Sequence, residues 1–335
     1  MHFRKRDKVS LSLAVALTAV FALFFLGGGF LRNAEPPRAF APTASETAVP
    51  TEEPSAVEPT SVPDRVFEKV AVSCLVTVPD GYGAVREETR EEKIDFAASD
   101  GRCTAANKTL TSLSPDLDRL LASFSPTGGD KTVLLYHTHT SEGYASSADG
   151  LYRLGKDGLT DTPSENGVVA VGDALAEELT KRGIRVIHLR DTFDSPSRSG
   201  SFTRSRAAAE KILAEETVDL AIDLHRGVIQ QSGGDRVKPT VTVNGAKAAQ
   251  ITLIGYAFAE ETLPPTLAVQ HALLSLSPHL CLPVSLGDQE YNFSLSAPCL
   301  MAEIGTDVNT LPEAQRAARL LGEAIAAALQ RKNAE

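Results

Sequence analysis

The stretch LLYHTHTSEGY (residues 134–144) carries two histidines and a glutamate directly after an apolar run. His139 and Glu142 have the spacing H-x-x-E, which places an imidazole and a carboxylate on the same side of a turn or of the start of a helix. Both side chains are common zinc ligands. The pattern therefore indicates a metal site with His139 and Glu142 as two of its ligands.

His137 competes with His139 for the same ligand position. Their side chains share one face if the strand continues through both residues, and point to different sides if a turn intervenes. The H-x-x-E spacing favours His139. His137 would then lie behind the metal ligands or contact the substrate.

Two later apolar runs also end in side chains that can bind a metal ion or carry a proton. VDLAIDLHR (218–226) ends with Asp223, His225 and Arg226, and CLMAEIG (299–305) contains Glu303. Two imidazoles and one carboxylate form a common catalytic zinc set, in which a fourth position stays open for water. Such a zinc ion lowers the pKa of water and polarises a carbonyl group. With Glu303 as the general base, the indicated chemistry is metal-assisted hydrolysis of an amide or a similar bond.

The elements that carry these residues must bring them together. From residue 131 onward, short apolar runs alternate with amphipathic segments, which predicts strands and helices in turn. We expect strands at 132–136, 184–189, 218–225, 250–257 and 298–305, and helices at 167–183, 203–216, near 265–277 and from 310 to about 330. The capping box Thr310-x-x-Glu313 opens the last helix.

This alternation predicts an α/β fold, with a mostly parallel sheet and helices on both faces. In such sheets, ligands bind beyond the carboxyl ends of the strands, which is where the candidate residues lie. His188 also ends a predicted strand, and we expect it to be structural.

The first 64 residues differ from the rest of the chain. A basic N-terminus (1–9) precedes an uncharged apolar stretch (10–31) that is long enough to cross a hydrocarbon core of roughly 30 Å. We expect an uncleaved transmembrane anchor with a cytoplasmic N-terminus, since the one small-residue cleavage candidate, 39–41, lies far downstream. Residues 32–64 are rich in proline and predict a disordered linker outside the membrane.

Residues 65–129 show weaker patterns of secondary structure than the rest of the chain after residue 64. They are interpreted as a small accessory region, or as an N-terminal extension of a main domain at 130–335. A short helix is expected at 114–124, capped by Ser114.

The four cysteines, Cys74, Cys103, Cys281 and Cys299, form no C-x-x-C pair, so a thiolate zinc site is not expected. Outside the cytoplasm they could pair as Cys74–Cys103 and Cys281–Cys299, or remain isolated small apolar residues. The net charge of -10 and the lack of a basic block after the first eight residues argue against nucleic acid as a partner.

The motifs YHTHTSEGY, VVAVGDALAEELTKRGIRVIH, SFTRS, AIDLHR and MAEIGTDVN, in this order, resemble the stage II sporulation protein P family. The resemblance runs from about residue 131 to the C-terminus. Members of this family are membrane-anchored peptidoglycan amidases of endospore-forming bacteria. The resemblance implies an amidase-type fold, Zn²⁺ as cofactor and cleavage of the N-acetylmuramoyl-L-alanine bond in septal wall thinning and engulfment.

The resemblance also implies roles for single residues. Carried over by motif, the zinc ligands fall on His139, Glu142 and His225, and the catalytic base on Glu303. Glu165 is the alternative second ligand, because the wider amidase group often takes its glutamate from the start of the helix after the first loop.

Further implications concern substrate and partners. Arg226 and Arg204 would contact carboxylates of the stem peptide, since guanidinium groups suit carboxylates. Stage II sporulation proteins D and M would be partners. One departure is Gly227, where the family commonly has an acidic residue. Two other functions remain open: a zinc carboxypeptidase or endopeptidase acting on stem peptides, and a non-enzymatic wall-binding scaffold.

Overall fold

The computed structural model describes residues 82–91, 102–126, 128–145, 151–153, 164–230 and 235–331. The basic N-terminus, the anchor at 10–31 and the linker at 32–64 that the sequence predicts all lie outside the described residues. Within the described residues, no helix is long and apolar enough to cross a membrane.

Seven of the described strands form the main sheet, in the order β2-β10-β9-β11-β6-β3-β5. Their bounds are β2 (Ala105–Asn107), β3 (Thr132–Tyr136), β5 (Arg185–His188), β6 (Leu220–Gly227), β9 (Ile251–Tyr256), β10 (Val284–Gly287) and β11 (Cys299–Thr306). β11, β6, β3 and β5 are parallel, and so are β9, β10 and β2. The two groups meet at the antiparallel pair β9–β11. The predicted mostly parallel sheet is confirmed, and the antiparallel junction is an addition to it.

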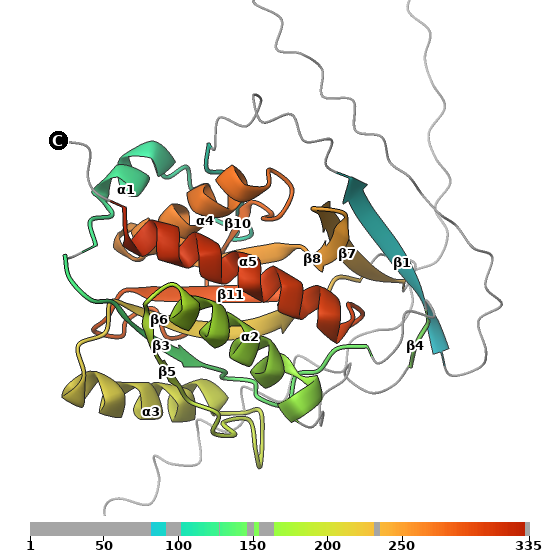
Figure 1. Ribbon diagram of the computed structural model, residues 1–335, viewed down its shortest axis with the longest axis horizontal. Helices are drawn as coiled ribbons and strands as arrows, with labels where there is room; N and C mark the ends of the chain where they lie inside the picture. The colour runs from blue at the N-terminus through green and yellow to red at the C-terminus, as the bar shows by residue number, and fades with distance from the viewer. Residues whose placement is uncertain are drawn as a thin grey trace, which may run out of the picture. The chain divides into compact units, whose positions relative to one another are not determined.

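Helices cover both faces of this sheet, as predicted (Figure 1). One face carries α1 (Leu117–Ser123), α2 (Val168–Lys181), α4 (Pro264–Leu276) and α5 (Leu311–Leu329), and the other carries α3 (Ser201–Glu215). Two short 3-10 helices, η1 (Ser164–Asn166) and η2 (Glu260–Thr262), precede α2 and α4. In β3, Leu135 packs into the core under α2, whereas Leu134 and Tyr136 pack under α3. Side chains alternate between the faces because a strand has a period of two.

Apolar packing holds the layer of α2 and α5 together. Leu175 and Leu321 are fully buried, and Gly322 allows the two helices to approach closely, since a Cβ there would lie 3.0 Å from the Cβ of Glu178.

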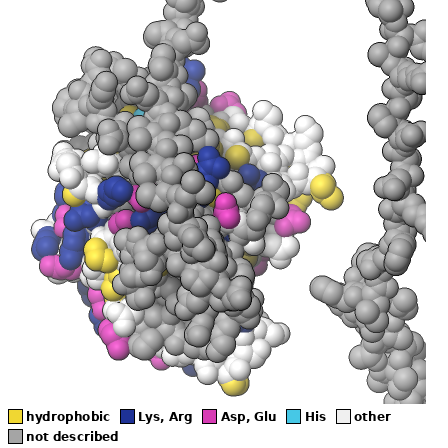
Figure 2. Space-filling view, turned by 90° about the vertical axis from the view of Figure 1, so that its right-hand side faces the viewer, with side chains coloured by type: hydrophobic (Ala, Val, Ile, Leu, Met, Phe, Trp, Pro, Cys, Tyr) yellow, Lys and Arg dark blue, Asp and Glu magenta, His cyan; other side chains and the backbone are white. Residues whose placement is uncertain are grey.

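Charged side chains of both signs lie close together on the described surface shown in Figure 2. Ion pairs between exposed groups add little, because water and salt screen them.

A second sheet has the order β4-β1-β7-β8. Its strands are β1 (Tyr82–Glu91), β4 (Leu151–Arg153), β7 (Arg236–Val243) and β8 (Ala246–Ala249). β7 and β8 form a hairpin around Asn244 and Gly245, both at positive φ (51° and 76°). Asn-Gly is a strong hairpin signal, because both residues tolerate positive φ.

Residues 102–126 are continuous with the main domain. β2 pairs with β10, α1 packs against α4, and Cys103 is buried in the core beneath α4. The helix begins later than predicted, because Asp116 and not Ser114 is its N-cap. The Asp116 carboxylate accepts from the Arg119 amide at 3.0 Å, which satisfies a free N–H of the first turn.

The sequence left two alternatives open for Cys281 and Cys299, a disulfide or two isolated apolar residues, and the structure has the second. Cys103, Cys281 and Cys299 are all free and buried. Cys281 lies in the core under α4, and Cys299 lies in the core under α3, so the main sheet separates them. Cys74, the proposed partner of Cys103, lies outside the described residues.

Candidate metal centre

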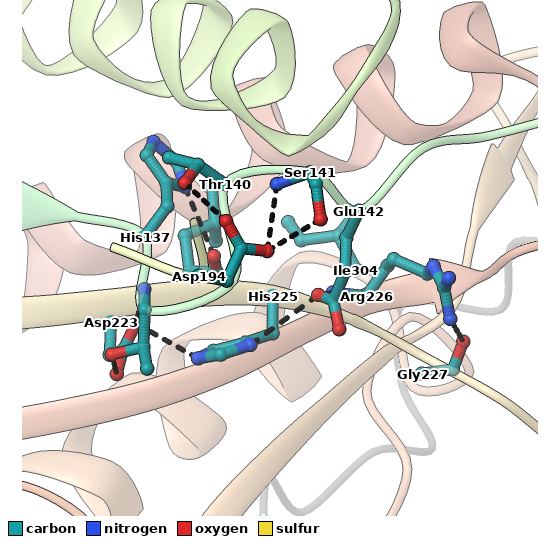
Figure 3. A network of polar contacts seen from close by, with 12 residues as sticks. His137, Thr140, Ser141, Glu142, Asp194, Asp223, His225, Arg226, Gly227 and Ile304 are labelled. Atoms are coloured by element: carbon teal, nitrogen blue, oxygen red, sulfur yellow. Dashed lines mark hydrogen bonds and ion pairs between the residues drawn. The ribbon is translucent and has the colours of Figure 1, made fainter. Parts of the chain in front are cut away.

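The polar turn after β3 begins at His137. The Glu142 amide donates to the carbonyl of His139 at 3.1 Å and closes this turn. Asp194 holds the turn from the side: its carboxylate accepts from Thr140 Oγ1 at 2.9 Å and from Ser141 N at 3.1 Å and Oγ at 2.5 Å (Figure 3). The chain is thus forced out of the extended conformation between His137 and His139.

His137 therefore points away from His139. It is fully buried, with Nδ1 3.0 Å from the carbonyl of Leu224 and Nε2 2.8 Å from Nε2 of His188. It packs against Gly172 of α2, so it lies on the opposite side of the sheet from α3. His188 contacts His137 and Asp173, in line with the structural role expected for it.

His225 lies between two carboxylates at the end of β6. Its Nε2 is 2.9 Å from Oδ1 of Asp223, and its Nδ1 is 3.4 Å from Oε2 of Glu142 (Figure 3). Asp223 and His225 are two positions apart on one strand, so they share a face of the sheet. Asp223 also accepts from Thr138 N at 2.9 Å and Thr138 Oγ1 at 2.6 Å, which ties the end of β6 to the turn after β3.

His139 completes this group. Its ring meets the ring of His225 edge-on, with centroids 5.3 Å apart. Phe202 of α3 also contacts both rings, at centroid distances of 5.5 Å to His139 and 6.2 Å to His225. The three ligands predicted from sequence, His139, Glu142 and His225, are therefore neighbours.

The charges of these groups depend on one another. Burial alone would lower the pKa of His225, but Asp223 and Glu142 raise that pKa well above its ordinary value. Burial opposes ionisation of Glu142, yet contact with His225 and the nearby Arg226 lower the pKa of Glu142 to about 2. Burial and the charge of His225 lower the pKa of His139 to about 4, so this imidazole is neutral near pH 7. Neutral imidazole is the form that binds metals.

Glu303 enters the site from the neighbouring strand. It stands opposite His225 in the β11–β6 register. A Cβ built on Gly227 would lie 3.0 Å from Oε2 of Glu303, which places this carboxylate beside the end of β6. Burial raises the pKa of Glu303. A carboxylate with a raised pKa is better suited to take up and release a proton near neutral pH.

The donor set fits a zinc ion. Tetrahedral zinc with bonds of about 2.0–2.1 Å holds its ligand atoms roughly 3.3 Å apart, close to the 3.4 Å between His225 Nδ1 and Glu142 Oε2. His139 Nδ1 is buried without a hydrogen-bond partner. Nε2 of His225 faces Asp223, which leaves Nδ1 on the side of Glu142. Among the described residues, no three His, Cys, Asp or Glu side chains are already arranged around a common metal position.

The remaining predicted site residues, Glu165, Arg226 and Arg204, have other surroundings. Glu165 is exposed on η1. Arg226 is buried: its amide donates to Glu142 at 3.2 Å and its Nε donates to the carbonyl of Gly143 at 3.3 Å. Arg204 donates to backbone carbonyls of the loop before α3, those of Phe193, Ser197 and Ser199. The guanidinium groups of both arginines thus bind the protein's own carbonyls.

Several residues of the site were not predicted. Asp223 was placed at the end of its strand but given no role, although the D-x-H pattern puts it on the same face as His225. Asp194 and Arg198 lie in an irregular loop that carries no periodic signal, and Arg198 Nη2 donates to Glu142 Oε1 at 3.1 Å. Tyr291 lies 4.9 Å from Phe202, ring centroid to ring centroid, and has a positive φ of 49°. Only the fold brings these residues to the site.

The chain matches the family described as Stage II sporulation protein P (SpoIIP) over residues 80–326, which is well over half of its length. It belongs to the SpoIIP family. The family match begins before β1, so it includes the second sheet as well as the main one. No curated protein sequence matches this SpoIIP-family chain.

Solved amidase structures show similarity to part of the chain. The CwlD amidase from Clostridioides difficile, solved in complex with the GerS lipoprotein, is 14% identical over 60% of this chain and 97% of its own, with a TM-score of 0.40. The amidase AmiC2 of Nostoc punctiforme is 14% identical over 61% and 97%, with a TM-score of 0.35. An N-acetylmuramoyl-L-alanine amidase from Clostridium difficile 630 is 16% identical over 60% and 96%, with a TM-score of 0.36.

Proposed function

We propose that this SpoIIP-family protein is a zinc-dependent N-acetylmuramoyl-L-alanine amidase that hydrolyses peptidoglycan. The observation that carries the proposal is the position of His225. It lies beside His139, between the carboxylates of Asp223 and Glu142, and stands in register with Glu303. Membership of the family that the motifs resemble supports the same reaction.

In this proposal His139, Glu142 and His225 hold the zinc ion. Zinc bound there would supply Lewis acidity, lowering the pKa of water and polarising the scissile carbonyl. Asp223 orients the His225 ring from the opposite nitrogen, as carboxylates commonly do behind metal-binding histidines. Thr138 and the turn held by Asp194 keep the other ligands in place.

Glu303 is the proton carrier of the proposed reaction. It accepts a proton from the attacking water and returns it to the amide nitrogen that leaves. The raised pKa of its carboxyl group suits both steps, because the group can hold the proton between them. Phe202 and the buried strands beneath the site limit access of bulk water.

Product analysis with the purified full chain tests the reaction. On purified peptidoglycan, the amidase releases new L-alanine amino termini, and a chelator abolishes this release until zinc is added back. New termini within the stem peptide alone would establish a zinc carboxypeptidase or endopeptidase instead. A chain that binds the wall but retains no zinc and releases no product would be a scaffold, and the enzyme proposal would fail.

The location of the protein is part of the same proposal. The apolar stretch at 10–31, preceded by basic residues, would anchor the chain in the cell membrane with the folded domain outside. There the amidase would thin the septal wall during engulfment, together with stage II sporulation proteins D and M. Protease added to intact protoplasts should digest the domain and spare the N-terminus. Protection of the domain would contradict this topology.

A further inference from the structure

Arg198 lies at the mouth of the candidate metal centre. Its guanidinium donates to Oε1 of Glu142 at 3.1 Å, and its side chain is 46% exposed, whereas that of Glu142 is 6% exposed. Within the described part of the chain, Glu142 is the ion-pair partner of this guanidinium. A half-exposed cation therefore stands beside Glu142, one of the proposed ligands.

The loop that carries Arg198 is firmly attached. Asp194, at its start, binds the turn of Thr140 and Ser141 through three hydrogen bonds. Arg204, from the first turn of α3, donates to three carbonyls along residues 193–199. Because the loop is tied to the turn at one end and to α3 along its length, the backbone that carries Arg198 needs little ordering when a ligand arrives.

The charge around Glu142 shows what Arg198 can bind. Oε2 of Glu142 already faces His225 and the amide of Arg226, and only Oε1 faces Arg198. If Glu142 shares its negative charge with a metal ion, it becomes a weaker acceptor for Arg198. The half-exposed guanidinium is then available to another anion, and its planar pair of donors matches a carboxylate.

We propose that Arg198 binds a carboxylate of the substrate's peptide, close to the scissile amide, and that it selects acidic stem peptides over amidated ones. This inference rests on the proposed amidase function, because it assigns one contact of that substrate. It replaces Arg204 and Arg226, whose guanidinium groups are bound to backbone carbonyls, as the carboxylate-binding residue.

The test compares two ligands on the full chain. One is a muramoyl peptide with free carboxylates, and the other is the same compound with its carboxylates converted to carboxamides. Binding is measured calorimetrically on the zinc-loaded Glu303→Gln variant, which should not turn the ligand over, and kcat/KM is measured on the otherwise unchanged chain. We expect both to favour the free carboxylate by about tenfold or more, the range of a lost hydrogen bond to a charged group.

Substitution of Arg198 should remove this preference. Arg198→Ala should bind and cleave both compounds equally, mainly through loss of affinity for the acidic one, and Arg198→Lys should keep part of the preference. Arg190→Ala is the matched control, since Arg190 is an exposed arginine that pairs with Asp173 away from Glu142. It should leave the preference intact.

Three results would overturn the assignment. The unchanged chain could treat both compounds alike, or Arg198→Ala could keep the full preference. Arg198→Ala could also lose zinc to the same extent as Glu142→Ala, which would show that Arg198 only holds the ligand. If the unchanged chain neither binds nor cleaves either compound, the proposed amidase function fails, and the carboxylate contact fails with it.

Discussion

Oδ1 of Asp223 lies 2.9 Å from Nε2 of His225, and the two residues project from the same face of β6. The same carboxylate accepts two hydrogen bonds from Thr138, so it couples the strand to the turn that carries His139. The orientation of one proposed ligand and the position of another therefore depend on a single aspartate. This coupling leads to the first prediction.

Asp223→Asn should weaken zinc binding. Asparagine keeps the shape of the side chain but lacks the charge that holds the His225 ring, and losses of about 10- to 100-fold in metal affinity are typical of such changes. Competition with a fluorescent chelator measures the affinity. Asp219→Asn is the control, because Asp219 pairs with Lys131 at the opposite end of the β3–β6 pair and should affect stability only. Equal zinc affinity for Asp223→Asn and the unchanged chain would rule out the orienting role.

Glu142→Ala should abolish zinc retention, whereas Glu165→Ala should not. Glu142 is buried against His225, and Glu165 is exposed on η1. Zinc content of the purified variants, measured by atomic emission, separates them. If the Glu165 variant alone lost zinc, Glu165 would replace Glu142 as the second zinc ligand. The fold described above would be unaffected.

Glu303→Gln should keep its zinc and lose nearly all activity. Glutamine fills the same space beside Gly227 but cannot take up a proton. A decrease in kcat of at least about 100-fold is expected, the lower end of what a general base contributes. Zinc content and peptidoglycan release are measured on the same preparation. Activity within a few fold of the unchanged chain would show that another group is the base.

Gly227→Ala should reduce kcat by about tenfold at unchanged zinc content. A Cβ there would lie 3.0 Å from Oε2 of Glu303 and 3.1 Å from the carbonyl of Gly305, so the base must shift by a few tenths of an ångström. Small displacements of reacting groups have effects of this size or larger. Gly287→Ala is the matched control, since a Cβ on Gly287 meets nothing within 4 Å. Unchanged kcat in the Gly227 variant would mean that Glu303 does not act from this position.

Gly172→Ala should destabilise the fold by about 1–3 kcal/mol, the usual cost of overpacking. Alanine would ordinarily stabilise a helix relative to glycine, but a Cβ on Gly172 would lie 2.6 Å from the ring of His137. Urea unfolding measures the free energy. In a His137→Ala background the closest contact is absent and only Nε2 of His188, at 3.0 Å, remains near the new Cβ, so the cost should fall. An equal cost in both backgrounds would contradict the close contact.

The amino-acid sequence determined the elements and the edge at which the site forms. The apolar runs that became β3, β6 and β11 are short, buried and followed by polar groups, and parallel strands bring such ends together. His139, Glu142, His225 and Glu303 were proposed as site residues this way, because each follows or ends a run whose period is visible locally. The capping box at Thr310 and Glu313 was readable for the same reason and is present.

Only the tertiary structure decided the contacts that depend on how the chain turns. His137 and His139 differ by two positions, yet the turn held by Asp194 sends one under α2 and the other toward α3. Cys281 and Cys299 are near in sequence, but the sheet lies between them. Asp194 and Arg198 come from an irregular loop, where no repeating pattern reports which side chains face the site. Local periodicity specifies strands and helices, whereas the partners of loop residues depend on long-range packing that forms only when the whole sheet is assembled.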